Sequence, residues 1–145
     1  MGKHLLWLAE ERYPDRKIIV WAGTAHIMRD PDFTDAGMSG PAMGKVVWNA
    51  LGEESYSIGM TSYQGENNFI ISDQHLLPEF EQLMNAAGFE YGFVDLRDAA
   101  REGNWLSIPF LARPRSHHTE NRAWSDKLDA LFFVKEQERR RQVEE

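Results

Sequence analysis

A continuous apolar run near the start of the chain leads directly to a histidine. The stretch reads Lys17-Ile-Ile-Val-Trp-Ala-Gly-Thr-Ala-His26, so bulky apolar residues give way to small and polar ones. Because apolar and polar residues do not alternate, both faces of a strand formed here would be covered, which predicts a central parallel strand at 17–22. Side chains that follow such a strand lie at the carboxyl edge of the sheet, where open α/β sheets bind ligands.

Three other segments have the apolar spacing of amphipathic helices. Residues 2–13 combine helix-forming residues with a broad apolar face. Residues 41–51 begin with a proline, carry apolar residues at every third or fourth position and end before Gly52. Residues 76–87 repeat this pattern and end before a glycine. We therefore predict three helices.

Shorter apolar segments predict further strands at 56–60, 91–95 and 129–134. Residues 61–65 have the composition of a turn, and residues 105–111 predict a short strand or an extended segment. Helix and strand thus alternate along the chain. This order predicts an α/β fold with a mostly parallel sheet of about four or five strands and helices on its faces.

The organisation of the chain indicates one domain, 1–134, followed by a charged tail, 135–145, that is a solvated helix or disordered. The helix at 2–13 has no strand before it, although a helix in an α/β sheet normally connects two strands. We therefore expect a partial version of a larger α/β fold. Such a fold leaves a sheet edge exposed, which we expect a homo-oligomer or a partner chain to cover.

Composition narrows the function classes. The 145 residues include no cysteine, which excludes disulfides, thiolate nucleophiles and cysteine-ligated metals. A formal net charge of -7 argues against nucleic acid as a partner. No apolar stretch approaches the ~20 residues of a membrane-spanning helix, and Glu10 and Glu11 stand where a signal peptide would carry its cleavage site. We expect a cytoplasmic protein that does not bind membranes.

His26 is the leading candidate for chemistry, because imidazole serves as general base, electrophile or ligand at neutral pH. Thr24 stands beside it at the predicted end of the strand. The alternative is a structural histidine that hydrogen-bonds to loop backbone, and the sequence does not decide between the two roles.

Four residues after the other predicted strands complete a candidate polar cleft. Tyr63 and Gln64 offer hydrogen bonds to a substrate. Asp95 and Arg97 lie two positions apart, so they point to the same side, where an ion pair would shape the cleft or bind an anionic group. A purely structural pair is the alternative.

Other polar residues favour structural roles. Glu79 and Glu81 read as acids of a first helical turn, which favour the helix macrodipole. His117 and His118 are adjacent and diverge on an extended chain, which favours a solvated loop over a metal site. The motifs of serine-triad hydrolases, dinucleotide enzymes, phosphate loops and zinc proteases are missing from the sequence. We expect no metal and no cofactor.

A series of short blocks along the chain resembles the C-terminal part of the erythromycin esterase family in order and spacing. The blocks are Leu5-Leu-Trp-Leu-Ala-Glu, Lys17-Ile-Ile-Val-Trp-Ala, Ala25-His-Ile, Met43-Gly with Leu51-Gly, Tyr56-Ser-Ile-Gly-Met-Thr, Asp95-Leu-Arg, Trp105-Leu with Pro109 and Arg113, and Asp129-Ala-Leu-Phe-Phe. The resemblance implies an α/β hydrolase that uses neither serine nor metal. In the resistance enzymes of this family, a histidine activates water to open a macrolide lactone.

The chain departs from the family pattern at two places. The family's strand usually ends Trp-Ala-His-Asn-(Ala/Gly)-His, so the resemblance assigns the second histidine to His26, with Gly23 in place of the first and Thr24 in place of the asparagine. Family members also carry an upstream Gly-Glu-x-x-His type segment that supplies a glutamate and the histidine thought to be the general base, and nothing in these residues corresponds to it. We expect a C-terminal fragment or a reduced homologue.

Two functional hypotheses follow. The first is an erythromycin-esterase-like hydrolase domain for a small-molecule ester or lactone, incomplete and inactive alone or nearly so, with His26 as its catalytic residue. The resemblance and the strand ends together assign substrate binding to Thr24, Tyr63, Gln64, Asp95 and Arg97. The second is a non-catalytic small-molecule-binding or assembly module derived from the same fold.

Overall fold

The sheet is built around one central strand. The computed structural model describes residues 1–29, 40–65, 76–115 and 118–138. In these ranges β5 (Ala130–Gln137) pairs in parallel with β1 (Ile58–Gly65) and antiparallel with β2 (Tyr91–Asp95). A separate antiparallel pair is formed by β3 (Phe110–Ala112) and β4 (Glu120–Arg122).

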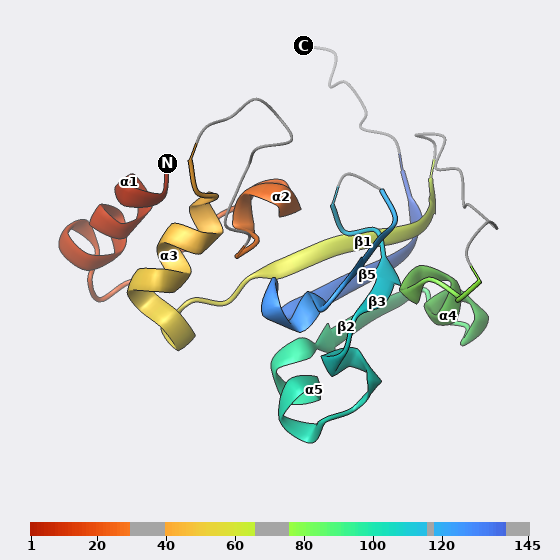
Figure 1. Cartoon of the computed structure of the whole chain (residues 1–145). Helices are drawn as coiled ribbons and strands as arrows, with labels where there is room; N and C mark the ends of the chain where they lie inside the picture. Colours follow the sequence, from red (N-terminus) through yellow and green to blue (C-terminus); the bar gives the residue numbers. More distant parts are fainter. Residues whose placement is uncertain (30–39, 66–75, 116–117, 139–145) are drawn as a thin grey trace, which may run out of the picture.

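Two of the helices pack against each other beside this sheet (Figure 1). They are α1 (Gly2–Trp7), which continues as a π-helical turn at Leu8–Arg12, and α3 (Met43–Leu51). The two helices pack so closely that a Cβ at Gly2 would lie 2.6 Å from the Val46 side chain. The remaining helices are α2 (Thr24–Ile27), α4 (Phe80–Ala86) and α5 (Leu96–Glu102).

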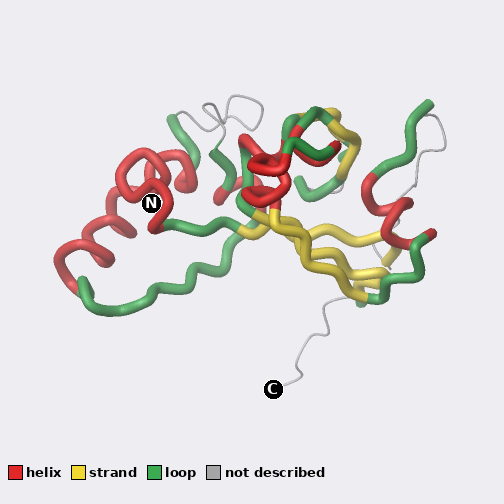
Figure 2. The backbone as a smooth tube through the Cα atoms, turned by 90° about the horizontal axis from the view of Figure 1, so that it is seen from below, coloured by secondary structure: helices red, strands yellow, loops and turns green. Residues whose placement is uncertain are grey.

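Helices lie beside both ends of β1. Figures 1 and 2 place α1 and α3 together beside the amino end of β1, and α4 at the opposite end of the sheet. Short α2 packs against both α3 and β1. Among the described residues, no helix is long and apolar enough to cross a membrane.

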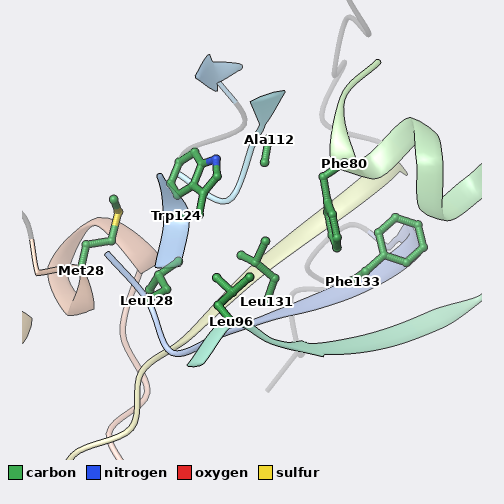
Figure 3. Close-up of a cluster of buried hydrophobic side chains, with 8 residues drawn as sticks. All are labelled: Met28, Phe80, Leu96, Ala112, Trp124, Leu128, Leu131 and Phe133. Carbon is green, nitrogen blue, oxygen red and sulfur yellow. The ribbon is translucent and has the colours of Figure 1, made fainter. Parts of the chain in front are cut away.

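Eight buried side chains form the hydrophobic core (Figure 3). They come from the segment after α2, from α4, α5, β3 and β5, and from the loop before β5: Met28, Phe80, Leu96, Ala112, Trp124, Leu128, Leu131 and Phe133. Trp124 is fully buried, and its indole N–H donates to the Phe110 carbonyl at 3.0 Å. Seven of these eight residues lie in the carboxyl half of the chain, and α1 and α3 contribute none of them.

Several predicted elements are confirmed. The helix at 41–51 is α3, which ends at Gly52 with a positive φ of 52°. The helix at 2–13 is α1 with its π-helical extension. The strand at 91–95 is β2, and the strand at 129–134 is β5, which extends to Gln137. The α/β class is confirmed, whereas four or five mostly parallel strands are not, because the described sheet has three strands and one parallel pair.

The predicted strand at 17–22 is wrong for this structure. The segment is exposed throughout, with Ile19 91% and Trp21 85% accessible. No backbone hydrogen bond joins residues 17–22 to any other described part of the chain. A strand needs a neighbouring strand to satisfy its backbone donors and acceptors. The local pattern favours β structure here, but the described residues provide no such neighbour.

Three other predictions need correction. Residues 61–65 form the second half of β1 rather than a turn, because they pair with β5 as far as Gly65. The third helix begins at Phe80, since Glu79 and Gln82 form a capping box that fixes the start; exposed Leu76 lies outside it. Residues 105–111 contain a 3-10 turn and the start of β3. Residues 139–145 of the predicted tail and His117 lie outside the described residues.

The two tryptophans Trp21 and Trp124 offer a matched test of this fold. Trp124→Ala removes a fully buried side chain and should lower the free energy of unfolding by about 3–5 kcal/mol. Trp21→Ala removes an exposed side chain and should change it by about 0.5 kcal/mol or less. Urea unfolding followed by far-UV circular dichroism measures both. A comparable loss for Trp21→Ala would mean that residues 17–22 are packed as a buried strand after all.

Candidate functional site

Thr24 and His26 lie on α2, beside the amino ends of β1 and β5. The backbones of α2 and α3 touch, because a Cβ at Gly44 would lie 1.9 Å from the Ile27 carbonyl oxygen. The Thr24 methyl lies close to β1 at Gly59. The Arg29 N–H, just beyond α2, donates to the Lys127 carbonyl at 3.1 Å. The partly buried His26 is therefore held at the amino edge of the sheet.

The carboxylate of Asp129 is the centre of this edge. Its side chain is 1% exposed, and its Oδ1 atom accepts hydrogen bonds from the guanidinium groups of Arg29 and Arg97. Its Oδ2 atom accepts from the Ser57 backbone N–H at 2.7 Å and from the Ser57 hydroxyl at 3.0 Å. Burial by itself would raise the pKa of Asp129, but the hydrogen bonds from both arginines lower it below its usual value.

Aromatic rings hold the two arginines in place. The Arg29 guanidinium carbon lies 3.6 Å from the Trp48 ring centroid, and that of Arg97 lies 5.7 Å from the same ring. Arg97 also lies over the Tyr56 ring at 4.8 Å and donates to the Ser55 carbonyl. Each guanidinium thus combines an ion pair with a cation–π contact.

Asp95 has partners of its own rather than forming an ion pair with Arg97. Its Oδ2 accepts from the Tyr56 hydroxyl at 2.5 Å, and its Oδ1 accepts from the Asp98 N–H at the start of α5. Burial and the Asp95 carboxylate raise the pKa of Tyr56. Burial would raise the pKa of Asp95, yet hydrogen bonds, first that from Tyr56, lower it. Asp95 therefore caps the amino end of α5 and holds the Tyr56 side chain in place.

The six predicted site residues do not form one cleft. Thr24, His26, Asp95 and Arg97 gather at the amino edge of β1, whereas Tyr63 and Gln64 lie near its carboxyl end, about 20 Å away along the strand. The prediction placed all strand ends together because it assumed parallel strands. The antiparallel direction of β2 instead brings Asp95 and Arg97 to the amino end of β1.

Asp129, Arg29 and Trp48 are the residues of this edge that the sequence reasoning missed. A charged residue immediately before the apolar run of β5 was the available signal for Asp129. Its partners, Ser57 and the two arginines, come from segments 32 to 100 residues away along the chain. No local pattern reports contacts over such separations. Among the described residues, no group of three or more histidine or acidic residues could hold a metal ion.

Comparison with known proteins identifies the fold family. The family model described as erythromycin esterase matches residues 1–137. The chain belongs to the erythromycin esterase family. This assignment covers α1 through the end of β5 and so includes both edges of the sheet.

Two relatives and two solved structures agree with this assignment. The chain is 25% identical to "Putative hydrolase YbfO" of Bacillus subtilis (strain 168), over 92% of this chain and 33% of that protein. It is 37% identical to "Erythromycin esterase type II" of Escherichia coli, over 45% and 16%. Two crystal structures share its fold: that of a Bacillus cereus protein, with a TM-score of 0.71 at 17% identity, and that of a succinoglycan biosynthesis protein, with a TM-score of 0.69 at 16% identity. Each match covers 94% of this chain and 37% of the chain in the crystal structure. The chain thus spans about a third of the length of YbfO.

The buried ion pairs at Asp129 predict a defined pH dependence. Asp129→Asn leaves Arg29 and Arg97 without their shared carboxylate and should lower the free energy of unfolding at pH 7 by about 3 kcal/mol. Because the pKa of Asp129 is lowered by folding, its stabilisation is present above the unfolded pKa of about 4 and is lost as the pH falls through the folded pKa. Urea unfolding between pH 7 and pH 3 should therefore show a shallower acid loss in the variant. Parallel pH curves for both proteins would contradict this role.

Proposed function

We propose that the chain is an erythromycin-esterase-like hydrolase domain with its reactive group at the amino edge of the sheet. The observation that carries the proposal is the family match over residues 1–137, together with the retention of His26 on a helix packed against that edge. Thr24, Asp95 and Arg97 share this edge and are the proposed contacts for a small-molecule ester or lactone. Tyr63 and Gln64 are too far away to contact the same substrate.

His26 acts in this proposal as the general base. It accepts a proton from water while the water oxygen bonds to the carbonyl carbon of the ester. The tetrahedral intermediate then expels the alcohol oxygen, which takes the proton back from His26, so the products are a carboxylic acid and an alcohol. Arg29 and Arg97 supply positive charge at the same edge, which favours the oxyanion of the intermediate.

The activity of these residues alone should be weak. Gly23 stands where the family pattern has another histidine, and the upstream Gly-Glu-x-x-His type segment has no counterpart in these residues. Loss of one general acid or base typically lowers the rate about 10²–10⁴-fold. We therefore expect turnover of activated aryl esters before turnover of macrolide lactones.

Hydrolysis assays test this proposal directly. The purified chain should hydrolyse an activated aryl ester such as p-nitrophenyl acetate above the buffer rate, with erythromycin assayed in parallel for ring opening. His26→Ala should lower kcat/KM about 10²-fold or more, because it removes the base. His118→Ala, which removes an exposed histidine outside the site, is the matched control and should leave the rate unchanged. Equal rates for wild type and His26→Ala would exclude His26 from the mechanism.

A second candidate function is that of an assembly module. Residues 18–21 are four consecutive apolar residues outside any helix or strand, without a backbone hydrogen bond to the other described residues, and Ile19 and Trp21 are largely exposed. A groove of about 380 Å³ adjoins this segment and is lined by Leu8, Tyr13, Arg16, Lys17 and Ile18. Exposed apolar segments of β character pair readily with identical segments. We propose that this segment associates with the same segment of a second copy of the chain.

The association state provides the test. Light scattering coupled to size-exclusion chromatography should give an average mass that rises from that of the monomer toward that of the dimer as the protein concentration increases. Ile19→Lys introduces a charge at the centre of the exposed segment and should return the chain to the monomer without affecting its folding. Ile108→Lys, which also replaces an exposed isoleucine by lysine but outside the segment, is the control. A wild-type monomer at all concentrations would refute the proposed association.

A further inference from the structure

A second ionic cluster lies in the interior at the other end of β1. Glu79 and Glu81 begin α4, and Arg113 follows β3. The three side chains are 0%, 0% and 2% exposed. The Arg113 Nε atom lies 3.0 Å from Glu79 Oε2 and 3.8 Å from Glu81 Oε2, and its Nη2 donates to the Tyr63 carbonyl at 3.2 Å. The cluster thus joins α4 and the segment after β3 to the carboxyl half of β1.

The charges of this cluster do not balance if both carboxyl groups are ionised. Among the described residues, the ion pairs of Glu79 and Glu81 within 4 Å are both made with Arg113. The neighbouring groups on β1 and before β4 are the neutral hydroxyls of Thr61 and Thr119. Burying a carboxylate without a countercharge costs several kcal/mol, so one uncompensated negative charge is strongly disfavoured.

Hydrogen bonding divides the four carboxyl oxygens into two kinds. Glu81 Oε1 accepts from the Thr61 hydroxyl at 2.5 Å and from the Arg113 backbone N–H at 2.9 Å. Glu79 Oε1 accepts from the Thr119 hydroxyl at 2.6 Å. The two Oε2 atoms and the Arg113 Nε atom between them are also buried, and none of the three has a well-aligned hydrogen bond among the described residues. Nε lies 3.0 Å from Glu79 Oε2, within reach of an ion pair, but 3.8 Å from Glu81 Oε2, which leaves this oxygen the least satisfied of the four. Buried polar atoms without a partner are rare and need an explanation.

One proton balances the charge of the cluster. We propose that Glu79 and Glu81 share a single proton at neutral pH, carried on Glu81 Oε2, the carboxyl oxygen that lies farther from Arg113 Nε. The positive charge of Arg113 lies closer to Glu79 Oε2 than to Glu81 Oε2, which favours the proton on Glu81. Burial raises the pKa of the Glu81 carboxyl, which agrees with a proton on this residue. The hydrogen bonds that Glu81 accepts from Thr61 and Arg113 lower its pKa, but by less than burial raises it.

The shared proton makes the attachment of α4 weaken as the pH rises. Because the pKa of Glu81 is raised by folding, its stabilisation is complete below the unfolded pKa of about 4.3 and is lost as the pH rises through the folded value. Deprotonation then leaves two buried carboxylates facing one guanidinium. The structure joined by these side chains includes α4, β1 at Thr61 and the segment after β3, so we expect this region to loosen first at high pH.

A pair of isosteric variants tests the proposal. Glu81→Gln retains Oε1 as an acceptor for Thr61 and Arg113, and places an NH₂ donor where the protonated Oε2 is proposed. Its urea midpoint at pH 7 should equal or exceed that of the wild type, and the loss of stability with rising pH that Glu81 causes should disappear. Glu79→Gln removes the carboxylate that pairs with Arg113 and should lower the midpoint. A lowered midpoint for Glu81→Gln, equal to that of Glu79→Gln, would overturn the assignment.

A direct measurement on the wild-type chain complements the variants. Carboxyl ¹³C NMR, with the Glu81 signal assigned by its disappearance in Glu81→Gln, reports the protonation state of each glutamate. Glu81 should have the shift of a neutral carboxylic acid at pH 7, and Glu79 that of a carboxylate. Two ionised side chains at pH 7 would refute the shared proton, even if neither variant folds, because the signals can then be assigned by through-bond experiments on the wild type.

Discussion

The carboxylate of Asp129 holds together the part of the molecule on which the candidate site depends. Its two oxygens bind the segment after α2 through Arg29, the start of β1 through Ser57 and the start of α5 through Arg97. The backbone of the same residue donates to the Ser57 carbonyl and accepts from the Leu96 N–H. One buried residue thus fixes three segments that are distant in sequence, and one of them directly follows α2, which carries His26.

The helices and the central strand follow from local sequence, because their information is local. The apolar stripe of α3 and the glycine that ends it are visible within ten residues, and the apolar run of β5 predicts a buried strand by the same logic. Residues 17–22 have an equally clear pattern, but a strand also requires a neighbour, and no local pattern supplies one. The pattern of apolar residues predicts which structure a segment favours, but a strand forms only where a neighbouring strand pairs with it.

The direction of β2 explains why the candidate site was predicted only in part. The five residues Tyr91–Asp95 would read identically in a parallel or an antiparallel strand, so their sequence does not report on which edge Asp95 lies. The partners of Asp129 were hidden for a related reason, since arginines are common on surfaces and only the fold selects Arg29 and Arg97. Residue types near strand ends could be predicted; their assembly at one edge could not.

The backbone geometry at Gly23 shows whether the fold itself requires a glycine at this position. Gly23 caps α2 with φ −60° and ψ 143°, a conformation that every residue type adopts readily. A Cβ built there would meet, among the described residues, the His26 ring carbon Cδ2 at 3.7 Å, which is an ordinary contact. By contrast, a Cβ at Gly44 would collide with the backbone of α2. The fold therefore requires glycine at position 44 but not at position 23. The histidine that the family resemblance would place at position 23 therefore meets a backbone that accepts its conformation and its Cβ, so the fold does not account for the glycine there.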